Sequence, residues 1–343
     1  MSGSSGIDVV AITGARAGVG RATVQAFARR GAHIGLVARG RDELEVVRQE
    51  VEAKGGKALV LLTDVADSAQ VEAAAAAVEE TFGPIDLWVN NAMVTVFSSV
   101  KEMLPEEYLR VTEVTYLGYV YGTLAALKYM LPRDRGTIVQ VGSALVYRSI
   151  PLQSAYCGAK AAIRGFTDSL RTELIHDGSH VRVTMVQMPA LNTPQFTWCK
   201  TRMPRRLQPV PPIFQPDVAA EAIVWASQHD RRELDVGWPT VAAIWGQKFI
   251  PGLLGHYLGW TGYDSQQYDG PPSPDRPVDL WEPVPGNFGA HGSFDSRSSD
   301  RSSQFWMTTP PELACSGRSR GCRCRRGLPS APVAGARRRR QPS

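Results

Sequence analysis

The stretch "DVVAITGARAGVG" at residues 8–20 decides the fold. Its first half is a short apolar, β-branched run of the kind found in buried strands, and its second half is rich in glycine. Gly14, Gly18 and Gly20 would allow a tight turn whose backbone N–H groups approach a pyrophosphate at a helix N-terminus. Their spacing is not G-x-G-x-x-G, so a purely structural turn is the alternative. The stretch predicts a strand–turn–helix unit that binds a dinucleotide.

The remainder of residues 7–240 repeats this alternation of short strands and longer helices. Helical patterns fall at 41–54, 69–80 and 216–228. Near-continuous apolar strands between helices are typical of a parallel sheet that is covered on both faces. We therefore predict an α/β fold, a doubly wound parallel sheet of the Rossmann type, in a single domain with a C-terminal extension. The predicted strands are 8–13, 33–38, 57–63, 86–90, 136–142, 181–188 and 233–237.

The pattern changes in the extension, residues 241–310. Residues 242–260 are apolar and aromatic, which predicts a helix that caps the core, a flap over an apolar pocket, or a contact with a membrane surface. Residues 264–310 are rich in Pro, Gly and Ser and are expected to be looped. Residues 311–343 contain nine arginines with Glu312 as their only acid, and we expect this tail to be disordered.

Composition excludes several classes of function. The formal net charge of +5 comes from the arginine tail, so the body offers no basic surface for nucleic acid. The sequence shows no basic segment followed by an apolar core, so no signal peptide is predicted. It also has no run of 18 uninterrupted apolar residues, so no membrane-spanning helix is predicted. Cys157 and Cys199 are isolated, as expected in a reducing cytoplasm, and no metal site is predicted.

The end of the second strand indicates which dinucleotide is bound. An acid that binds the ribose 2′-hydroxyl is expected there in NAD sites, but Ala38 and Arg39 stand in its place. Arg39, together with Arg16 in the glycine turn, could pair with a 2′-phosphate, although both could also be solvated surface arginines. The sequence favours NADP(H) over NAD(H).

With these motifs in this order, residues 7–240 resemble the short-chain dehydrogenase/reductase family. "TGARAGVG" (13–20) resembles its glycine motif, "TDV" (63–65) its adenine contact, and "NNA" (90–92) its turn after the fourth strand. "VGS" (141–143) and "YCGAK" (156–160) resemble its catalytic segments. The resemblance implies cofactor contacts at Thr13, Gly14, Arg16, Gly18, Val19, Gly20, Arg39, Asp64, Val65, Asn91, Ala92, Tyr156, Lys160, Pro189 and Thr193.

The chemistry of the motif residues agrees with that resemblance. Tyr156 and Lys160 are four residues apart on one helix face, and a neighbouring cation would lower the pKa of a phenol toward that of a useful acid–base group. Ser143 would donate a hydrogen bond to the substrate oxygen. The family commonly has Asn where this chain has Thr115, so Thr115 is expected as a participant in the proton relay.

These features predict an NADP(H)-dependent oxidoreductase that interconverts a carbonyl and an alcohol on a small, apolar substrate. The family resemblance also implies a homodimer or tetramer, and a surface contact with a membrane stays open. The alternative is a catalytically weak NADP-binding or scaffold protein. Three features suggest this alternative: Thr115, Met93 in place of the family's usual glycine, and the appended C-terminus.

Overall fold

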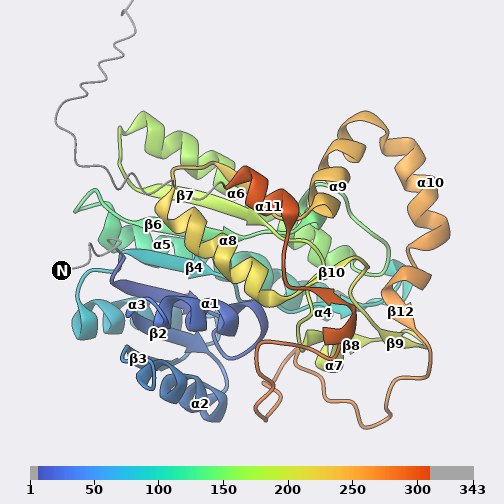
Figure 1. The fold of residues 1–343 in the computed structure, drawn as a ribbon, viewed down its shortest axis with the longest axis horizontal. Helices are drawn as coiled ribbons and strands as arrows, with labels where there is room; N and C mark the ends of the chain where they lie inside the picture. The colour runs from blue at the N-terminus through green and yellow to red at the C-terminus, as the bar shows by residue number, and fades with distance from the viewer. Residues whose placement is uncertain (1–6, 310–343) are drawn as a thin grey trace, which may run out of the picture. The chain divides into compact units, whose positions relative to one another are not determined.

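A seven-stranded parallel sheet forms the centre of the structure, a computed structural model that describes residues 7–309 (Figure 1). All seven predicted strands are present and pair in the order β11-β7-β6-β4-β1-β2-β3, which confirms the doubly wound sheet. The strands are β1 (Val9–Thr13), β2 (His33–Ala38), β3 (Lys57–Leu62), β4 (Leu87–Asn90), β6 (Thr137–Val141), β7 (Arg182–Gln187) and β11 (Glu233–Asp235).

The switch point of the sheet lies between β1 and β4. The chain proceeds outward from β1 through β2 to β3, and then returns to build β4, β6, β7 and β11 on the other side. The loops that follow β1 and β4 therefore separate at the carboxyl edge, where open α/β sheets bind their ligands.

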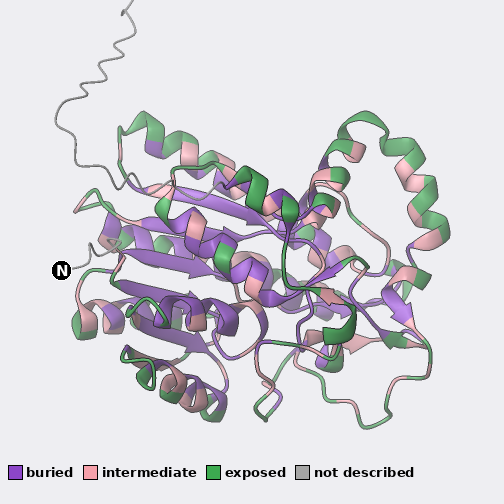
Figure 2. Ribbon diagram, viewed as in Figure 1, coloured by how far each residue is buried: buried purple, intermediate pink, exposed green. Residues whose placement is uncertain are grey.

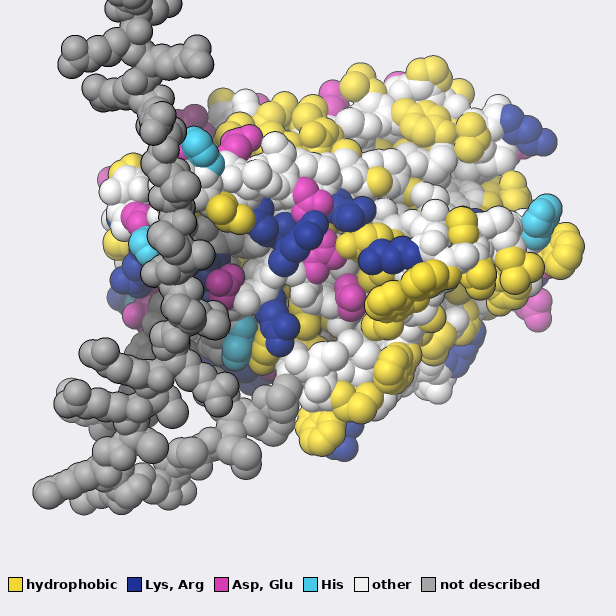
Figure 3. Space-filling view, turned by 90° about the horizontal axis from the view of Figure 1, so that it is seen from above, with side chains coloured by type: hydrophobic (Ala, Val, Ile, Leu, Met, Phe, Trp, Pro, Cys, Tyr) yellow, Lys and Arg dark blue, Asp and Glu magenta, His cyan; other side chains and the backbone are white. Residues whose placement is uncertain are grey.

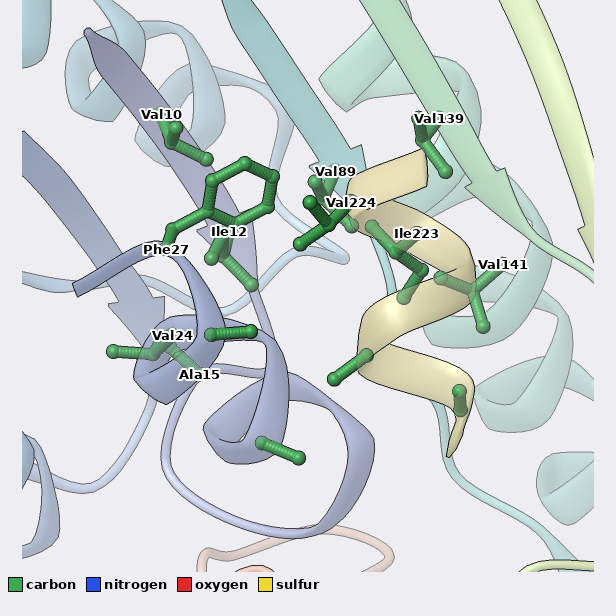
Figure 4. Packing of buried hydrophobic residues seen from close by; sticks show 14 of the residues in the cluster. Val10, Ile12, Ala15, Val24, Phe27, Val89, Val139, Val141, Ile223 and Val224 are labelled. Atoms are coloured by element: carbon green, nitrogen blue, oxygen red, sulfur yellow. The ribbon is translucent and has the colours of Figure 1, made fainter. Parts of the chain in front are cut away.

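Helices cover both faces of the sheet, and each face has its own apolar cluster (Figure 2). On one face, Phe27 packs over Ile12, and Ile223 lies beside Val141 (Figure 4). Burying a side chain of this size fully contributes roughly 1.5–3 kcal/mol. The helices of this face are α1 (Gly18–Ala28), α2 (Arg41–Glu52) and α8 (Pro216–Gln228). Those of the other are α3 (Ser68–Phe82), α4 (Pro105–Thr112), α5 (Gly118–Met130) and α6 (Ser154–His176).

Residues 190–215 form short elements rather than one open loop. They include helix α7 (Gln195–Trp198) and three two-residue strands, each paired with a segment from elsewhere in the chain. The short strands are β5 (Val96–Phe97) with β8 (Lys200–Thr201), β9 (Arg206–Leu207) with β12 (Gln267–Tyr268), and β10 (Ile213–Phe214) with β13 (Ser298–Ser299). Single helical turns occupy Val100–Glu102, Ala144–Val146, Asp264–Gln266 and Asp295–Arg297.

The extension begins with two helices, α9 (Trp238–Phe249) and α10 (Pro251–Thr261), where the sequence predicted one. Pro251 lacks the N–H that a continuous helix needs, so the helix restarts there. No residue of α10 is buried, and hydrophobic side chains gather on the surface that α9 and α10 form (Figure 3).

The remaining described residues, 262–309, are mostly irregular, as expected, and end in the short helix α11 (Ser303–Thr308). They return across the carboxyl edge of the sheet, where Gly18 N–H donates to Gly289 O at 3.1 Å. The described chain forms one compact unit that includes the extension. The predicted arginine tail, 311–343, lies outside the described residues.

Candidate active site

The glycine turn after β1 has the shape that its sequence predicted. Gly14 and Gly18 have φ angles of +68° and +57°, in the left-handed region that side chains disfavour. A Cβ on Gly20 would lie 2.1 Å from Gly14 O, so only glycine fits where the turn meets α1. The turn brings the N-terminus of α1 to the switch point of the sheet.

Thr13 and Asn91 hold this turn against the end of β4. Thr13 Oγ1 accepts hydrogen bonds from the backbone N–H groups of Asn91 and Ala92, at 2.8 and 3.0 Å. The Asn91 side chain donates to Thr13 O at 2.9 Å. Thr13 and Asn91 were predicted as cofactor contacts, and the structure shows that they build the turn itself.

A cavity of about 390 Å³ opens beside the glycine turn and reaches α6. It brings together many of the residues that the sequence predicted: Gly14, Arg16, Gly18, Val19, Asn91, Ala92, Ser143, Tyr156, Lys160, Pro189 and Thr193. The predicted site residues that do not line it are Thr13, Gly20, Arg39, Asp64, Val65 and Thr115.

Ser143 and Tyr156 both line the wall of this cavity, and the Ser143 side chain interacts with the phenol of Tyr156. Ser143 follows β6 and is fixed by a bond from its backbone N–H to Gln187 Oε1 at 2.9 Å. Tyr156 lies in the first turn of α6. Desolvation raises the pKa of Tyr156 well above its usual range, and the interaction with Ser143 opposes that rise. The structure thus differs from the expectation of a lowered phenol pKa, because burial outweighs any effect of Lys160.

Lys160 is 1% exposed, and its ammonium group reaches the end of β6. Lys160 Nζ donates to Val141 O at 2.6 Å and lies 5.7 Å from the centroid of the Tyr156 ring. Burial lowers the pKa of Lys160 to about 7. The ammonium group of Lys160 therefore lies near the ring of Tyr156. Among the contacts of the described residues, it makes no hydrogen bond to the Tyr156 hydroxyl.

The sequence did not single out Tyr119, which is the second partner of Lys160. Its hydroxyl accepts from Lys160 Nζ at 2.8 Å and donates to Val141 O at 3.0 Å. Tyr119 is buried, and a buried tyrosine usually finds a partner for its hydroxyl. The one available signal in the sequence was the spacing of Tyr119, which follows Thr115 by about one helical turn. This signal is weak, because Tyr116 and Tyr121 are close by in the sequence and the spacing does not distinguish Tyr119 from them.

Thr115 lies in a short π-helix (Glu113–Leu117) that precedes α5. Its hydroxyl donates to Val94 O at 2.9 Å and accepts from Val94 N at 3.1 Å. Both roles of the hydroxyl are thereby used to anchor the segment after β4. The geometry makes Thr115 a positioning residue and gives no support to the expectation that it takes part in a proton relay.

The predicted adenosine contacts are occupied by groups of the protein itself. Arg16 and Arg39 both pair with Asp279 of the extension, at 2.8 and 3.1 Å. Asp64 accepts from Arg110 Nη2 at 2.6 Å. The cavity is open beside the glycine turn, whereas the protein's own chain occupies the groups of Arg39.

The other end of the cavity is apolar, and the extension closes part of it. Leu254 and Leu258 of α10 line the cavity together with Met93 and Phe196. The extension therefore contributes part of the wall of the cavity. Within residues 7–309, no group of three or more His, Cys, Asp or Glu side chains is placed to hold a metal ion. Of the helices in that range, none has the length and apolarity to cross a membrane.

A glycine turn at the switch point of a parallel sheet, facing a serine, a tyrosine and a lysine, is the arrangement of a dinucleotide-dependent oxidoreductase. Comparison with known proteins agrees. The sequence pattern of the short chain dehydrogenase family matches residues 8–202. The chain belongs to this family.

Three similar proteins illustrate the match. The chain is 31% identical over 278 residues to the uncharacterized oxidoreductase YxnA of Bacillus subtilis, covering 80% of this chain and 78% of that protein. It is 29% identical over 220 residues to a fatty acyl-CoA reductase of Acinetobacter baylyi, covering 64% and 72%. An alcohol dehydrogenase from the archaeon Thermococcus sibiricus, complexed with 5-hydroxy-NADP, superposes with a TM-score of 0.57 at 28% identity, covering 67% and 95%.

Proposed function

We propose that this protein is an NADP(H)-dependent oxidoreductase that interconverts a carbonyl and an alcohol on an apolar substrate. The observation that carries the proposal is that Ser143, Tyr156 and Lys160 together line the cavity that the glycine turn opens. A nicotinamide cofactor would supply or accept the hydride. Gly14, Gly18 and Thr193 line the cavity where its pyrophosphate and nicotinamide would be held.

In the direction of reduction, Tyr156 gives its phenolic proton to the substrate oxygen as hydride reaches the carbon. A phenol is protonated at neutral pH, the state that an acid needs, but the raised pKa makes Tyr156 a weaker acid unless a nearby positive charge lowers that pKa. Ser143 donates a hydrogen bond to the same oxygen and orients it. Lys160 stabilises the phenolate that remains, because a cation near the ring favours the charged form.

The apolar lining supports a hydrophobic substrate. The similar Acinetobacter protein is a fatty acyl-CoA reductase, and an acyl chain would suit a pocket walled by Phe196, Leu254 and Leu258. The proposal extends to a cytoplasmic location, which suits the buried free thiols Cys157 and Cys199. It also includes a homodimer or tetramer, for which light scattering of the purified protein is the test.

The substitution Tyr156→Phe tests the proposed activity. It removes the proton donor and keeps the ring, so we expect turnover of a carbonyl substrate with NADPH to fall by about 10²–10⁴-fold. NADPH binding should change little. Unchanged turnover in the variant would contradict the role of Tyr156.

The second candidate is a catalytically weak NADP-binding or scaffold protein. Two observations favour it. The Thr115 hydroxyl is hydrogen-bonded to the backbone of Val94, and the Asp279 carboxylate pairs with Arg16 and Arg39. A broad panel of aldehydes and ketones distinguishes the candidates. Tight NADPH binding without NADPH oxidation on any of them would favour the scaffold.

A further inference from the structure

Asp279 places a carboxylate between the two arginines that the sequence assigned to a 2′-phosphate. Its Oδ1 lies 2.8 Å from Arg16 Nη2 and 3.1 Å from Arg39 Nη2. The three side chains are 9–17% exposed, so water screens these contacts poorly. Arg16 Nη2 makes no aligned hydrogen bond despite its closeness to Asp279, and it is a buried donor that another anion could use.

The backbone of the same segment completes the contact. Arg39 Nη1 donates to Trp281 O at 2.7 Å, and Arg16 Nη1 donates to Val284 O at 2.9 Å. We call residues 279–284 the plug segment. It contacts both guanidinium groups through the Asp279 carboxylate and three carbonyls, those of Trp281, Val284 and Asp279, the last of which accepts from Arg39 Nη2 at 2.9 Å.

Leu280 fills the space next to the arginines. It is 1% exposed and belongs to the apolar cluster that contains Val65 and Val114. Arg110 Nε donates to Leu280 O at 3.0 Å, while Arg110 Nη2 holds Asp64.

The cavity ends at the plug segment. Asp279 and Leu280 form its wall, and Arg39, Asp64 and Val65 lie outside that wall. The three residues that the family resemblance assigns to the adenosine are thus separated from the cavity by the protein's own chain.

The charge of this end decides which cofactor it disfavours. Arg16 and Arg39 carry two positive charges, and Asp279 with Glu43, whose Oε1 is 3.9 Å from Arg16 Nη1, carries two negative charges. A 2′-phosphate would enter a site of no net charge and would have to displace a tethered carboxylate, which competes at high effective concentration. An unphosphorylated ribose has no anion to place there.

Building on the proposed function, we propose that Asp279 is a specificity-determining residue for the cofactor. Its carboxylate competes with the 2′-phosphate of NADP(H) for Arg16 and Arg39 and so reduces the preference for NADP(H) over NAD(H) that the two arginines would otherwise give. Leu280, in contrast, occupies space that the adenosine of either cofactor requires.

The test compares Asp279→Asn with Leu280→Ala in the full-length protein by calorimetric titration with NADPH and with NADH. Asp279→Asn should lower the Kd for NADPH about tenfold, the effect of removing one competing charge of ~1.4 kcal/mol, with less than about a twofold change for NADH. Leu280→Ala should tighten both cofactors alike. Glu282→Gln, which neutralises an exposed acid of the same segment, is the matched control and should change neither.

A second measurement follows the segment directly. Amide hydrogen exchange of residues 279–284 should quicken at saturating NADPH if the phosphate displaces Asp279. Weaker or unchanged NADPH binding by Asp279→Asn, or an equal gain for NADH, would overturn the inference. Failure of the proposed function looks different, since turnover would then survive Tyr156→Phe whatever the cofactor affinities are.

Discussion

The hydroxyl of Tyr119 and the ammonium of Lys160 lie 2.8 Å apart, and both donate to the carbonyl of Val141. The ammonium group also lies 4.5 Å from the centroid of the Tyr119 ring. Among these contacts, the buried ammonium of Lys160 has no acidic partner. It is held by the phenol oxygen of Tyr119, the carbonyl of Val141 and the face of the Tyr119 ring. Tyr119 therefore fixes where the charge of Lys160 lies relative to Tyr156.

Replacing Tyr119 with Phe should impair turnover more than cofactor binding. The variant loses a hydrogen bond to a charged group, worth about 1.5–3 kcal/mol, so we expect kcat to fall roughly 10–100-fold. The charged form of Lys160 loses an acceptor, so its pKa falls, and the alkaline limb of the pH–rate profile, where Lys160 loses its proton, shifts to lower pH. Tyr121→Phe, which changes a half-buried tyrosine of the same helix, is the control. Equal profiles for the two variants would reduce Tyr119 to a packing residue.

The lowered pKa of Lys160 predicts how stability depends on pH. Because this pKa is about 7 in the folded protein and near 10 in an unfolded chain, the unfolded state binds more protons between these values. The contribution of Lys160 to stability therefore rises as pH rises from about 7. Buried Cys157 and Cys199 have raised pKa values and reverse the trend at higher pH, so the useful window is about pH 7–9.

The variant Lys160→Met isolates this effect, since it keeps the length of the side chain without the charge. We expect Lys160→Met to melt at a higher temperature than the natural protein at pH 7, and the difference to shrink by pH 9. Melting curves at several pH values in one ionic strength provide the measurement. A difference that is constant across the window would show that Lys160 does not titrate there.

Gly20→Ala should disrupt the glycine turn. The new Cβ would lie 2.1 Å from Gly14 O, a backbone atom that cannot move without opening the turn. We expect loss of measurable dinucleotide binding and a melting temperature several degrees lower, consistent with the roughly 1–3 kcal/mol typical of overpacking. Gly165→Ala is the control, because a Cβ on Gly165 meets nothing within 4 Å in helix α6. It should stabilise slightly, by about 0.5–1 kcal/mol. Intact binding in Gly20→Ala would contradict the proposed fit of the turn.

Most of the fold was predictable because the signals for it are local. The apolar run at Val9–Thr13 and the glycines after it specify strand, turn and helix within a dozen residues. The spacing of Tyr156 and Lys160 also places both on one helix face without knowledge of the rest of the chain.

The parts that sequence reasoning missed depend on contacts between distant residues. Asp279 meets Arg39 from 240 positions away, out of a segment with no helical or strand periodicity. Tyr119 belongs to a mainly apolar helix, where a tyrosine is an ordinary core residue until its hydroxyl partner is known. Neither role leaves a periodic pattern in the sequence.

The route of the extension has a consequence for how the protein is made. The Arg16–Val284 bond joins residues 268 positions apart, so the wall of the cleft closes only after nearly the whole described chain has left the ribosome. Contacts of such long sequence separation form late and slowly, because a large loop must close before they are gained. A nascent chain that has completed β11 can fold its central sheet while Arg16 and Arg39 are still unpaired. During that interval the cavity is open at the end that the plug segment closes in the finished protein.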